Sequence, residues 1–219
     1  MSVITVGGDE PCGLRERKKA RTREALLEAG LRLFTEHGFT ETTTQAIAAE
    51  ADVSQRTLFR YFASKEDIVL AVVDDAEEAF RLQVAARPAA EHPFAALVHA
   101  ADATWGDLDS RALETHVRLL RLCDGTPRLS AARLQRSATH LRLLAAVIAR
   151  RTGADARDPR PELLAAAFGS AVHVAVTRCC RLGGTEVEDL LESVRTCLRH
   201  LAPALTEPWG GGPAPTGGA

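Results

Sequence analysis

The sequence lacks an apolar run that approaches the roughly 18 residues needed to cross a bilayer. Its first residues also lack the apolar core and small-residue cleavage site of a secretory signal peptide. Hydrophobic residues make up 46% of the 219 residues and charged residues 26%, a balance that suits a folded core and argues against a membrane protein. We therefore expect a soluble, cytoplasmic protein with no membrane partner.

Motifs of catalysis are missing as well. There is no Gly-rich phosphate loop, no pair of carboxylates at a clear spacing and no nucleophile–base motif, so we expect no enzymatic activity. The five cysteines are Cys12, Cys123, Cys179, Cys180 and Cys197. They show neither metal-ligand nor disulfide spacing, which favours free thiols and no cofactor or metal. A metal role for His173 with Cys179 is the alternative, but their six-residue separation places them on poorly matched helix faces.

The overall charge gives no global sign of a nucleic-acid partner, because the formal net charge is -2. Basic residues are concentrated between Arg15 and Arg23, where Glu16 is the one acid. Such a cluster favours approach to phosphates. The same pattern is also typical of a solvated helix face.

Alanine, leucine, arginine and glutamate dominate the chain, and β-branched residues rarely alternate as they do in strands. This pattern predicts an all-α fold without strands or repeats. We expect four segments: a flexible arm at 1–14, an N-terminal three-helix domain at 15–64, a helical C-terminal domain at 65–205 and a disordered tail at 206–219.

The helices have recognisable ends. The first, over 15–37, carries an apolar stripe formed by Ala20, Leu27, Leu31 and Phe34. Gly38 then predicts a left-handed C-terminal cap. The next three helices are expected to start after Thr43 or Thr44, after Ser54 (helix 55–62) and after Ser64, with Pro88 ending the fourth. The later helices are expected at 92–107, 109–123, 127–152, 160–182 and 185–204.

The stretch from Thr42 to Lys65 has the pattern of a helix-turn-helix. Two short helices meet across a tight turn and are locked by the apolar residues Ile47, Ala48, Val53, Leu58 and Phe62. The outer face of the second of these helices is then free to enter a DNA major groove. Arg56 suits guanine, Gln55 suits adenine, and Thr57 suits a thymine methyl or a phosphate. A pair of amphipathic helices with a polar solvent face is the plain alternative.

The segment GFTETTTQAIAAEADVSQRTLFRYFASKEDIV resembles the DNA-binding domain of the TetR family, over roughly Arg21 to Val72. Asp52 stands where the family commonly has glycine; aspartate tolerates left-handed backbone angles, so we expect the turn to survive with some strain. Phe59 stands where the family often has tyrosine. The resemblance implies DNA contacts at Thr44, Gln45, Gln55, Arg56, Thr57, Arg60, Tyr61 and Lys65.

The resemblance also implies a division of labour in the C-terminal domain. Helices five to seven would enclose an effector pocket, and the last two helices would pair with a second subunit. The expected pocket residues are Trp105, His116, Leu120, His140 and His173. The expected interface residues are Leu164, Phe168, Val172, Leu190, Leu191, Val194 and Leu198. A purely intramolecular core is the alternative for these last two helices.

The segment TPRLSAARLQRSATHLRLLAAVIARR, followed by an alanine-rich helix and Gly183-Gly184, is similar to TetR-type regulators thought to take acyl-CoA-like ligands, including the mycofactocin type. We therefore expect a homodimeric transcriptional regulator, acting as a repressor that a small apolar or acyl-type molecule releases from a near-palindromic double-stranded operator. A constitutive or architectural DNA-binding protein with a solid body is the alternative. A cavity near Trp105 and His116 would distinguish the two.

Overall fold

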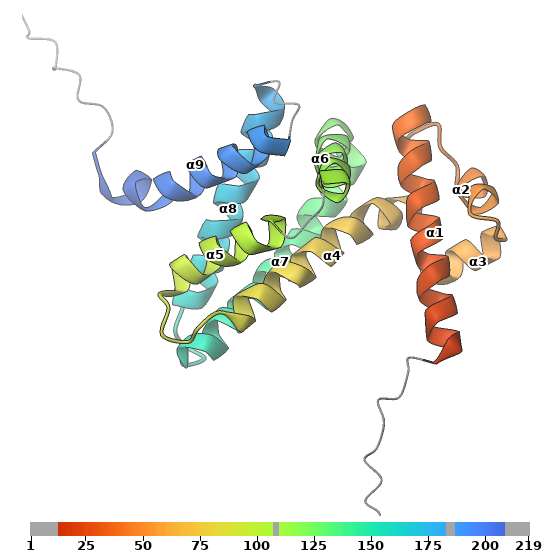
Figure 1. The fold of residues 1–219 in the computed structure, drawn as a ribbon. Coiled ribbons are helices and arrows are strands. Elements are labelled where there is room, and N and C mark those ends of the chain that lie inside the picture. Colours follow the sequence, from red (N-terminus) through yellow and green to blue (C-terminus); the bar gives the residue numbers. More distant parts are fainter. Residues whose placement is uncertain (1–12, 107–109, 183–186, 209–219) are drawn as a thin grey trace, which may run out of the picture. The chain divides into compact units, whose positions relative to one another are not determined.

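The computed structural model describes residues 13–106, 110–182 and 187–208. Within these ranges the chain forms nine α-helices and no strand, so the all-α prediction is confirmed (Figure 1). The expected arm at 1–14 and tail at 206–219 lie mostly outside the described residues. The helices are α1 (Leu14–His37), α2 (Thr44–Glu50), α3 (Gln55–Tyr61), α4 (Lys65–Ala86), α5 (Pro93–Gly106), α6 (Ser110–Gly125), α7 (Pro127–Thr152), α8 (Arg160–Arg181) and α9 (Val187–Thr206).

The chain divides into two compact units, Met1–Val72 and Val73–Ala219, and the division falls within α4. The N-terminal unit therefore includes the first turns of α4 as well as α1 to α3. The second unit, here called the body, contains the rest of α4 and the helices α5 to α9. One helix thus belongs to both units.

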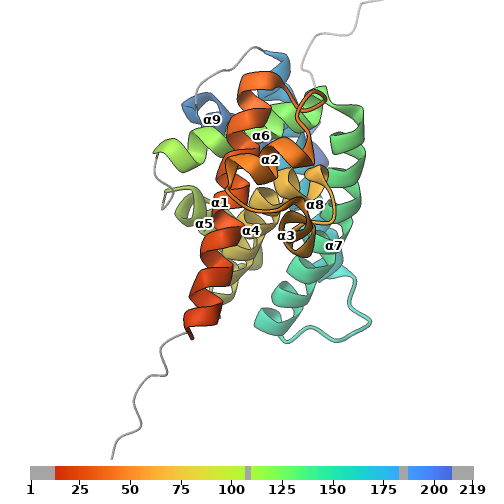
Figure 2. The same cartoon turned by 90° about the vertical axis from the view of Figure 1, so that its right-hand side faces the viewer.

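In the N-terminal unit α2 packs against α1, and α3 packs against α2 (Figures 1 and 2). Its core contains the fully buried side chains Leu26, Ile47, Leu58, Ile68 and Leu70. The expected stripe on α1 is partly wrong, because Phe34 is buried while Ala20 is exposed and Leu27 and Leu31 are half-buried. The buried face of α1 is centred on Leu26, which the spacing argument did not select.

Gly30 of α1 faces Ile68 of α4 at close range. A Cβ atom at this position would stand 2.7 Å from Ile68 Cγ2, closer than real Cβ contacts. Ile68 is itself fully buried and β-branched, so its side chain has little freedom to turn away. Glycine is therefore required for this crossing.

The turn that follows α1 differs in detail from the prediction. Gly38 has a positive φ of 83°, but its ψ of 159° lies outside the left-handed helical region. The Gly38 N–H donates to Phe34 O (3.1 Å), and the buried Thr42 hydroxyl, which has one proton to donate, lies 3.1 Å from Leu33 O and 2.7 Å from Gly38 O. The chain thus leaves α1 in an extended conformation that Thr42 holds.

The body is built around α8, which packs between α7 and α9. Its core includes Val84, Leu97, Ala100, Ala175 and Val194, all at 2% exposure or less. By length and composition α8 is also apolar enough to cross a membrane, which the sequence reading missed. Of that apolar window 33% is buried in the body, and the core helix of a soluble protein satisfies the same criteria.

The C-terminal end of α4 is tied to the end of α7 by Arg151. The guanidinium donates to the carbonyl oxygens of Val84 (3.0 Å), Arg87 and Pro88 (3.0 Å). These carbonyls belong to the last turn of α4 and the residues after it, where helix carbonyls lack partners within the helix. Arg151 therefore fixes one end of α4 within the body.

Candidate DNA-binding face and effector pocket

The helix α3 turns one apolar residue inward and most of its polar residues outward. Leu58 is fully buried, whereas Gln55, Arg56 and Arg60 are exposed and Thr57 and Tyr61 are half-buried. We call Gln55, Arg56, Thr57, Arg60 and Tyr61 the recognition face. A short helix with a bare face of arginine, glutamine and threonine has the donors and acceptors that read base edges.

Neighbouring groups orient several side chains of this face. Ser54 caps α3: its hydroxyl accepts from Thr57 N–H (3.1 Å) and lies 2.9 Å from Thr57 Oγ1. Gln55 Nε2 donates to Thr44 Oγ1 (2.9 Å) at the start of α2. The Arg60 guanidinium lies 5.3 Å from the centre of the Tyr61 ring. Gln45, the remaining expected contact on α2, is exposed.

Asp52 shapes the turn between α2 and α3. Its φ is 52°, and among the described residues it alone has a positive φ without being glycine. The Asp52 and Val53 N–H groups donate to Ala49 O (3.1 Å) and Ala48 O (2.9 Å). Aspartate at this position therefore adopts the left-handed conformation expected from the sequence.

Lys65 is engaged differently from the expectation. Its ammonium donates to the carbonyl oxygens of Phe39 (2.7 Å), Thr40 (3.1 Å) and Thr42 (3.0 Å), and it lies 4.5 Å from the Phe39 ring centre. An ammonium has three N–H donors, so all of them are used. The Lys65 side chain ties the start of α4 to the loop after α1 and has no donor left over for a phosphate.

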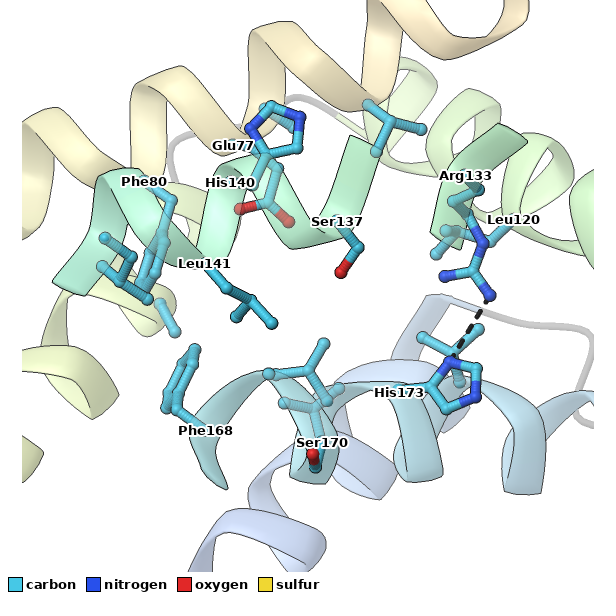
Figure 3. Close-up of a pocket in the computed structure, with 18 of the residues that line it drawn as sticks. Glu77, Phe80, Leu120, Arg133, Ser137, His140, Leu141, Phe168, Ser170 and His173 are labelled. Atoms are coloured by element: carbon cyan, nitrogen blue, oxygen red, sulfur yellow. Dashed lines mark hydrogen bonds between the residues drawn. The ribbon is translucent and has the colours of Figure 1, made fainter. Parts of the chain in front are cut away.

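The body contains a cavity of about 470 Å³ (Figure 3). Of the five expected pocket residues, Trp105, Leu120, His140 and His173 line it. The side chain of His116, on α6, lies outside the described residues. The structure therefore brings together four residues that stand far apart in the sequence.

Sequence reasoning missed other lining residues, above all Glu77 on α4 and Arg133 and Ser137 on α7. Arg133, Ser137 and His140 follow each other at spacings of four and three residues, so they share one face of α7. That spacing was a usable signal. No sequence signal pointed to Glu77, because a single acid on an amphipathic helix is expected to face solvent.

His140 connects α7 to α4 at one side of the cavity. Its Nε2 lies 2.8 Å from Asp74 Oδ1, and its Nδ1 lies 3.1 Å from Arg81 Nη1. Because a guanidinium only donates, Nδ1 accepts and Nε2 carries the proton. Burial raises the pKa of the nearby Glu77 carboxyl, an effect that His140 and Arg81 partly oppose. This side of the cavity is therefore polar.

The remaining lining is largely apolar. The rings of Phe80 and Phe168 are stacked, with centres 5.3 Å apart and planes inclined by 7°. Leu141, Leu144 and Val176 extend this wall, together with other residues of α7, α8 and α9. An apolar cavity with a few polar groups is the usual form of a small-molecule site.

In the part of the chain that the structure describes, the cysteines and the metal-ligating side chains form no second functional site. Cys123, Cys179, Cys180 and Cys197 are free there, and Cys12 lies outside the described residues. Burial raises the pKa of the Cys179 thiol, which makes it a poor nucleophile. Within the same ranges no three histidine, cysteine or acidic side chains gather to hold a metal ion.

Comparison with known proteins identifies both units. The family model for bacterial regulatory proteins, tetR family, matches residues 26–72, and the model for the MftR C-terminal domain matches residues 91–206. The regulator TcmR of Streptomyces glaucescens is 36% identical over 203 residues, which are 90% of this chain and 90% of TcmR. The chain belongs to the TetR family of transcriptional regulators.

More distant TetR-family relatives agree with this assignment. MftR of Mycobacterium tuberculosis, a candidate regulator of mycofactocin biosynthesis by its name, is 28% identical over 160 residues, covering 68% of this chain and 75% of MftR. A TetR-family regulator from Syntrophomonas wolfei superposes with a TM-score of 0.62 at 20% identity, covering 85% of this chain and 96% of that one. This last match shows that the fold is shared.

Membership fixes the general biochemistry. TetR-family regulators bind DNA through the N-terminal helix-turn-helix, respond to small-molecule effectors and act as dimers; they are not enzymes. The expected resemblance to the TetR family, with a body of the MftR type, is confirmed. The N-terminal unit ends at Val72, the same residue at which the first family model ends.

The residues expected at the dimer interface are mostly turned into the body. Phe168, Leu190, Val194 and Leu198 are 2–7% exposed and belong to its core, which corrects their assignment to a surface. Leu164 and Val172 are half-buried against that core, and Leu191 is half-buried. The large apolar side chains that α8 leaves exposed are Leu163 at 65% and Val174 at 54%.

Proposed function

We propose that this TetR-family regulator is a repressor that binds a near-palindromic operator as a homodimer and leaves it when a small apolar or acyl-type molecule binds the body. The observation that carries the proposal is the recognition face of α3, which is polar, exposed and held in place by Ser54 and Thr44. DNA binding by such a regulator would place it in the cytoplasm.

The recognition face supplies the base contacts in this proposal. Arg56 would read guanine and Gln55 adenine, the latter already oriented by Thr44. Thr44, Gln45, Thr57, Arg60 and Tyr61 would contact phosphates or neighbouring bases. Lys65 would act by holding the start of α4 in place, because its ammonium is already satisfied.

The cavity supplies the response to a ligand. Val73, Ala76, Glu77 and Phe80 line it, and all four belong to α4, whose first turns are part of the N-terminal unit. A ligand that favours another position of α4 would misalign the two copies of α3, which must enter successive major grooves about 34–36 Å apart. A coupling of about 1–3 kcal/mol between ligand and DNA changes operator affinity roughly 5- to 150-fold.

Dimerisation would use α8 and α9 in an isologous interface. In place of the buried residues, we propose that Leu163 and Val174 contribute apolar contact from α8, since both are more than half exposed. Covering an exposed leucine or valine removes apolar surface from water, which favours association.

The alternative of a constitutive DNA-binding protein predicts a solid body. A cavity of about 470 Å³ that includes Trp105 favours a ligand-responsive regulator instead. An empty cavity of this size lowers the stability of the fold, because the side chains that line it lose packing contacts. A bound ligand would restore those contacts.

The DNA-binding proposal is tested by selection of a binding site from random duplexes, followed by gel shift with the selected duplex. The double variant Arg56→Ala and Tyr61→Ala should bind at least roughly 30-fold more weakly, since each lost contact costs about 1–3 kcal/mol. Arg142→Gln, an exposed position on α7, serves as the control and should bind as the wild type does. Unchanged affinity of the double variant would refute the assignment of α3.

A further inference from the structure

We infer that the cavity binds an apolar ligand that ends in a carboxylate, and that the carboxylate is held by Arg133 beside His173. The inference rests on the proposed function of the cavity as an effector site and specifies the class of effector.

Arg133 has no anionic partner among the residues that the structure describes. Its Nε is buried and has no hydrogen-bond partner, and its Nη2 reaches only His173 Nδ1, at 3.5 Å. Within the described residues no carboxylate forms an ion pair with it, although arginines elsewhere on α7 and α4 have such partners. A buried N–H without an acceptor is unfavourable, so the Nε of the half-buried Arg133 carries a cost that an anionic ligand would relieve.

The position of Arg133 suits a ligand rather than a protein partner. It lines the cavity, and Figure 3 shows its guanidinium directed across the space between α7 and α8 toward His173. A carboxylate matches the planar fork of a guanidinium and accepts two parallel hydrogen bonds from it. His173 is exposed at this side, so the charged end of the ligand would lie near solvent.

The rest of the cavity suits an apolar tail. The stacked rings of Phe80 and Phe168, with Leu141, form the wall away from Arg133 (Figure 3). The volume of about 470 Å³ falls within the range of ordinary small-molecule sites. Among the described residues that line the cavity, Glu77 is the one acid; burial raises the pKa of its carboxyl, and it lies beside His140.

The test is calorimetric titration of the full-length dimer, without DNA, using decanoic acid, methyl decanoate and decylamine. The acid should bind at least ten-fold more tightly than either analogue. Arg133→Gln should lose that preference and bind the acid about ten-fold or more weakly, with the affinity for the ester changed less than two-fold. Arg142→Gln, with an exposed guanidinium on the same helix, is the matched control. Equal binding of acid and ester by the wild type overturns the inference.

Two further measurements keep the result decisive. Arg133→Lys retains the charge but not the planar fork, so it should give an intermediate affinity for the acid even if Arg133→Gln fails to fold. Decanoyl-CoA should bind no more tightly than the acid; tighter binding that is insensitive to Arg133→Gln overturns the inference in favour of a thioester. Gel shift distinguishes the ligand class from the effector role. If the protein binds DNA but not the acid, the ligand class alone is refuted. If the acid binds but does not release the DNA, the effector role is refuted and the ligand class stands.

Discussion

The N-terminal unit and the body contain matching close approaches at glycine, yet the surroundings differ. A Cβ on Gly30 would stand 2.7 Å from Ile68 Cγ2, and a Cβ on Gly169 would stand 2.5 Å from Leu141 Cδ2. Ile68 is fully buried among other core residues, whereas Leu141 lines the cavity and has space beside it. The crossing at Gly30 is thus closely packed, whereas Leu141 beside Gly169 has room to change its conformation. Close packing keeps the side chains that face DNA in place, and looser packing lets a sensor adjust to its ligand.

The largest expected difference between the units comes from removing core volume. Ile47→Ala, at a fully buried position, should lower the free energy of unfolding by about 2–5 kcal/mol. Leu141→Ala should cost less, because it enlarges an existing cavity instead of creating one. Urea denaturation followed by circular dichroism measures both. A larger loss for Leu141→Ala would contradict the comparison.

The glycine pair tests the comparison directly. Gly30→Ala should lower stability by about 1–3 kcal/mol through overpacking against Ile68. Gly169→Ala should be neutral or slightly stabilising, since alanine favours a helix by up to about 1 kcal/mol and Leu141 can turn into the cavity. Thermal unfolding of both variants gives the order. If Gly169→Ala is the more damaging, the body is as tightly packed as the N-terminal unit.

Filling the cavity should stabilise the body. The Ser137 side chain points into the space between α7 and α8 (Figure 3), so Ser137→Leu should add about 0.5–2 kcal/mol while blocking the ligand. The same kind of enlargement at Ala48, which is 2% exposed in the N-terminal unit, should destabilise. Differential scanning calorimetry distinguishes the two directions, and destabilisation by Ser137→Leu would show that the space is not available.

The smallest expected effect depends on pH. Burial raises the pKa of Glu77, so the folded protein binds its proton more tightly than the unfolded chain does. The wild type therefore loses stability as pH rises from about 4.5 through the raised folded-state pKa. Glu77→Gln should be more stable than the wild type above that window and equal to it in acid, as thermal midpoints against pH would show. Glu162→Gln, at an exposed site, is the control.

The fold of the N-terminal unit could be predicted because its determinants are local. Ser54 and Thr43 cap α3 and α2 through their own hydroxyl groups, as the sequence indicated. The left-handed conformation at Asp52 follows from the length of the turn and from the tolerance of aspartate for it. The local sequence did not predict the conformation of Gly38, because its ψ depends on Thr42, which lies beyond the turn itself.

The body was harder to predict because its determinants come from distant helices. Phe168 and Val194 were assigned to a dimer interface, but an apolar stripe does not say whether its partner lies in the same subunit. Arg133 was not selected at all, because its importance arises from what α8 places opposite it. Helix positions were nevertheless predicted well, with 127–152 matching α7 at both ends.

The three carbonyls held by Arg151 give α4 a fixed point at its C-terminal end. The helix has 22 residues and is therefore about 33 Å long. A tilt of about 5° around that point would displace the Lys65 end by about 3 Å, but the Phe80 region, close to the fulcrum, by far less. To produce the same tilt, a ligand that contacts α4 near Val73 must therefore displace the helix farther than a ligand near Phe80. The ligand near Val73 needs less force, because it acts farther from the fixed point.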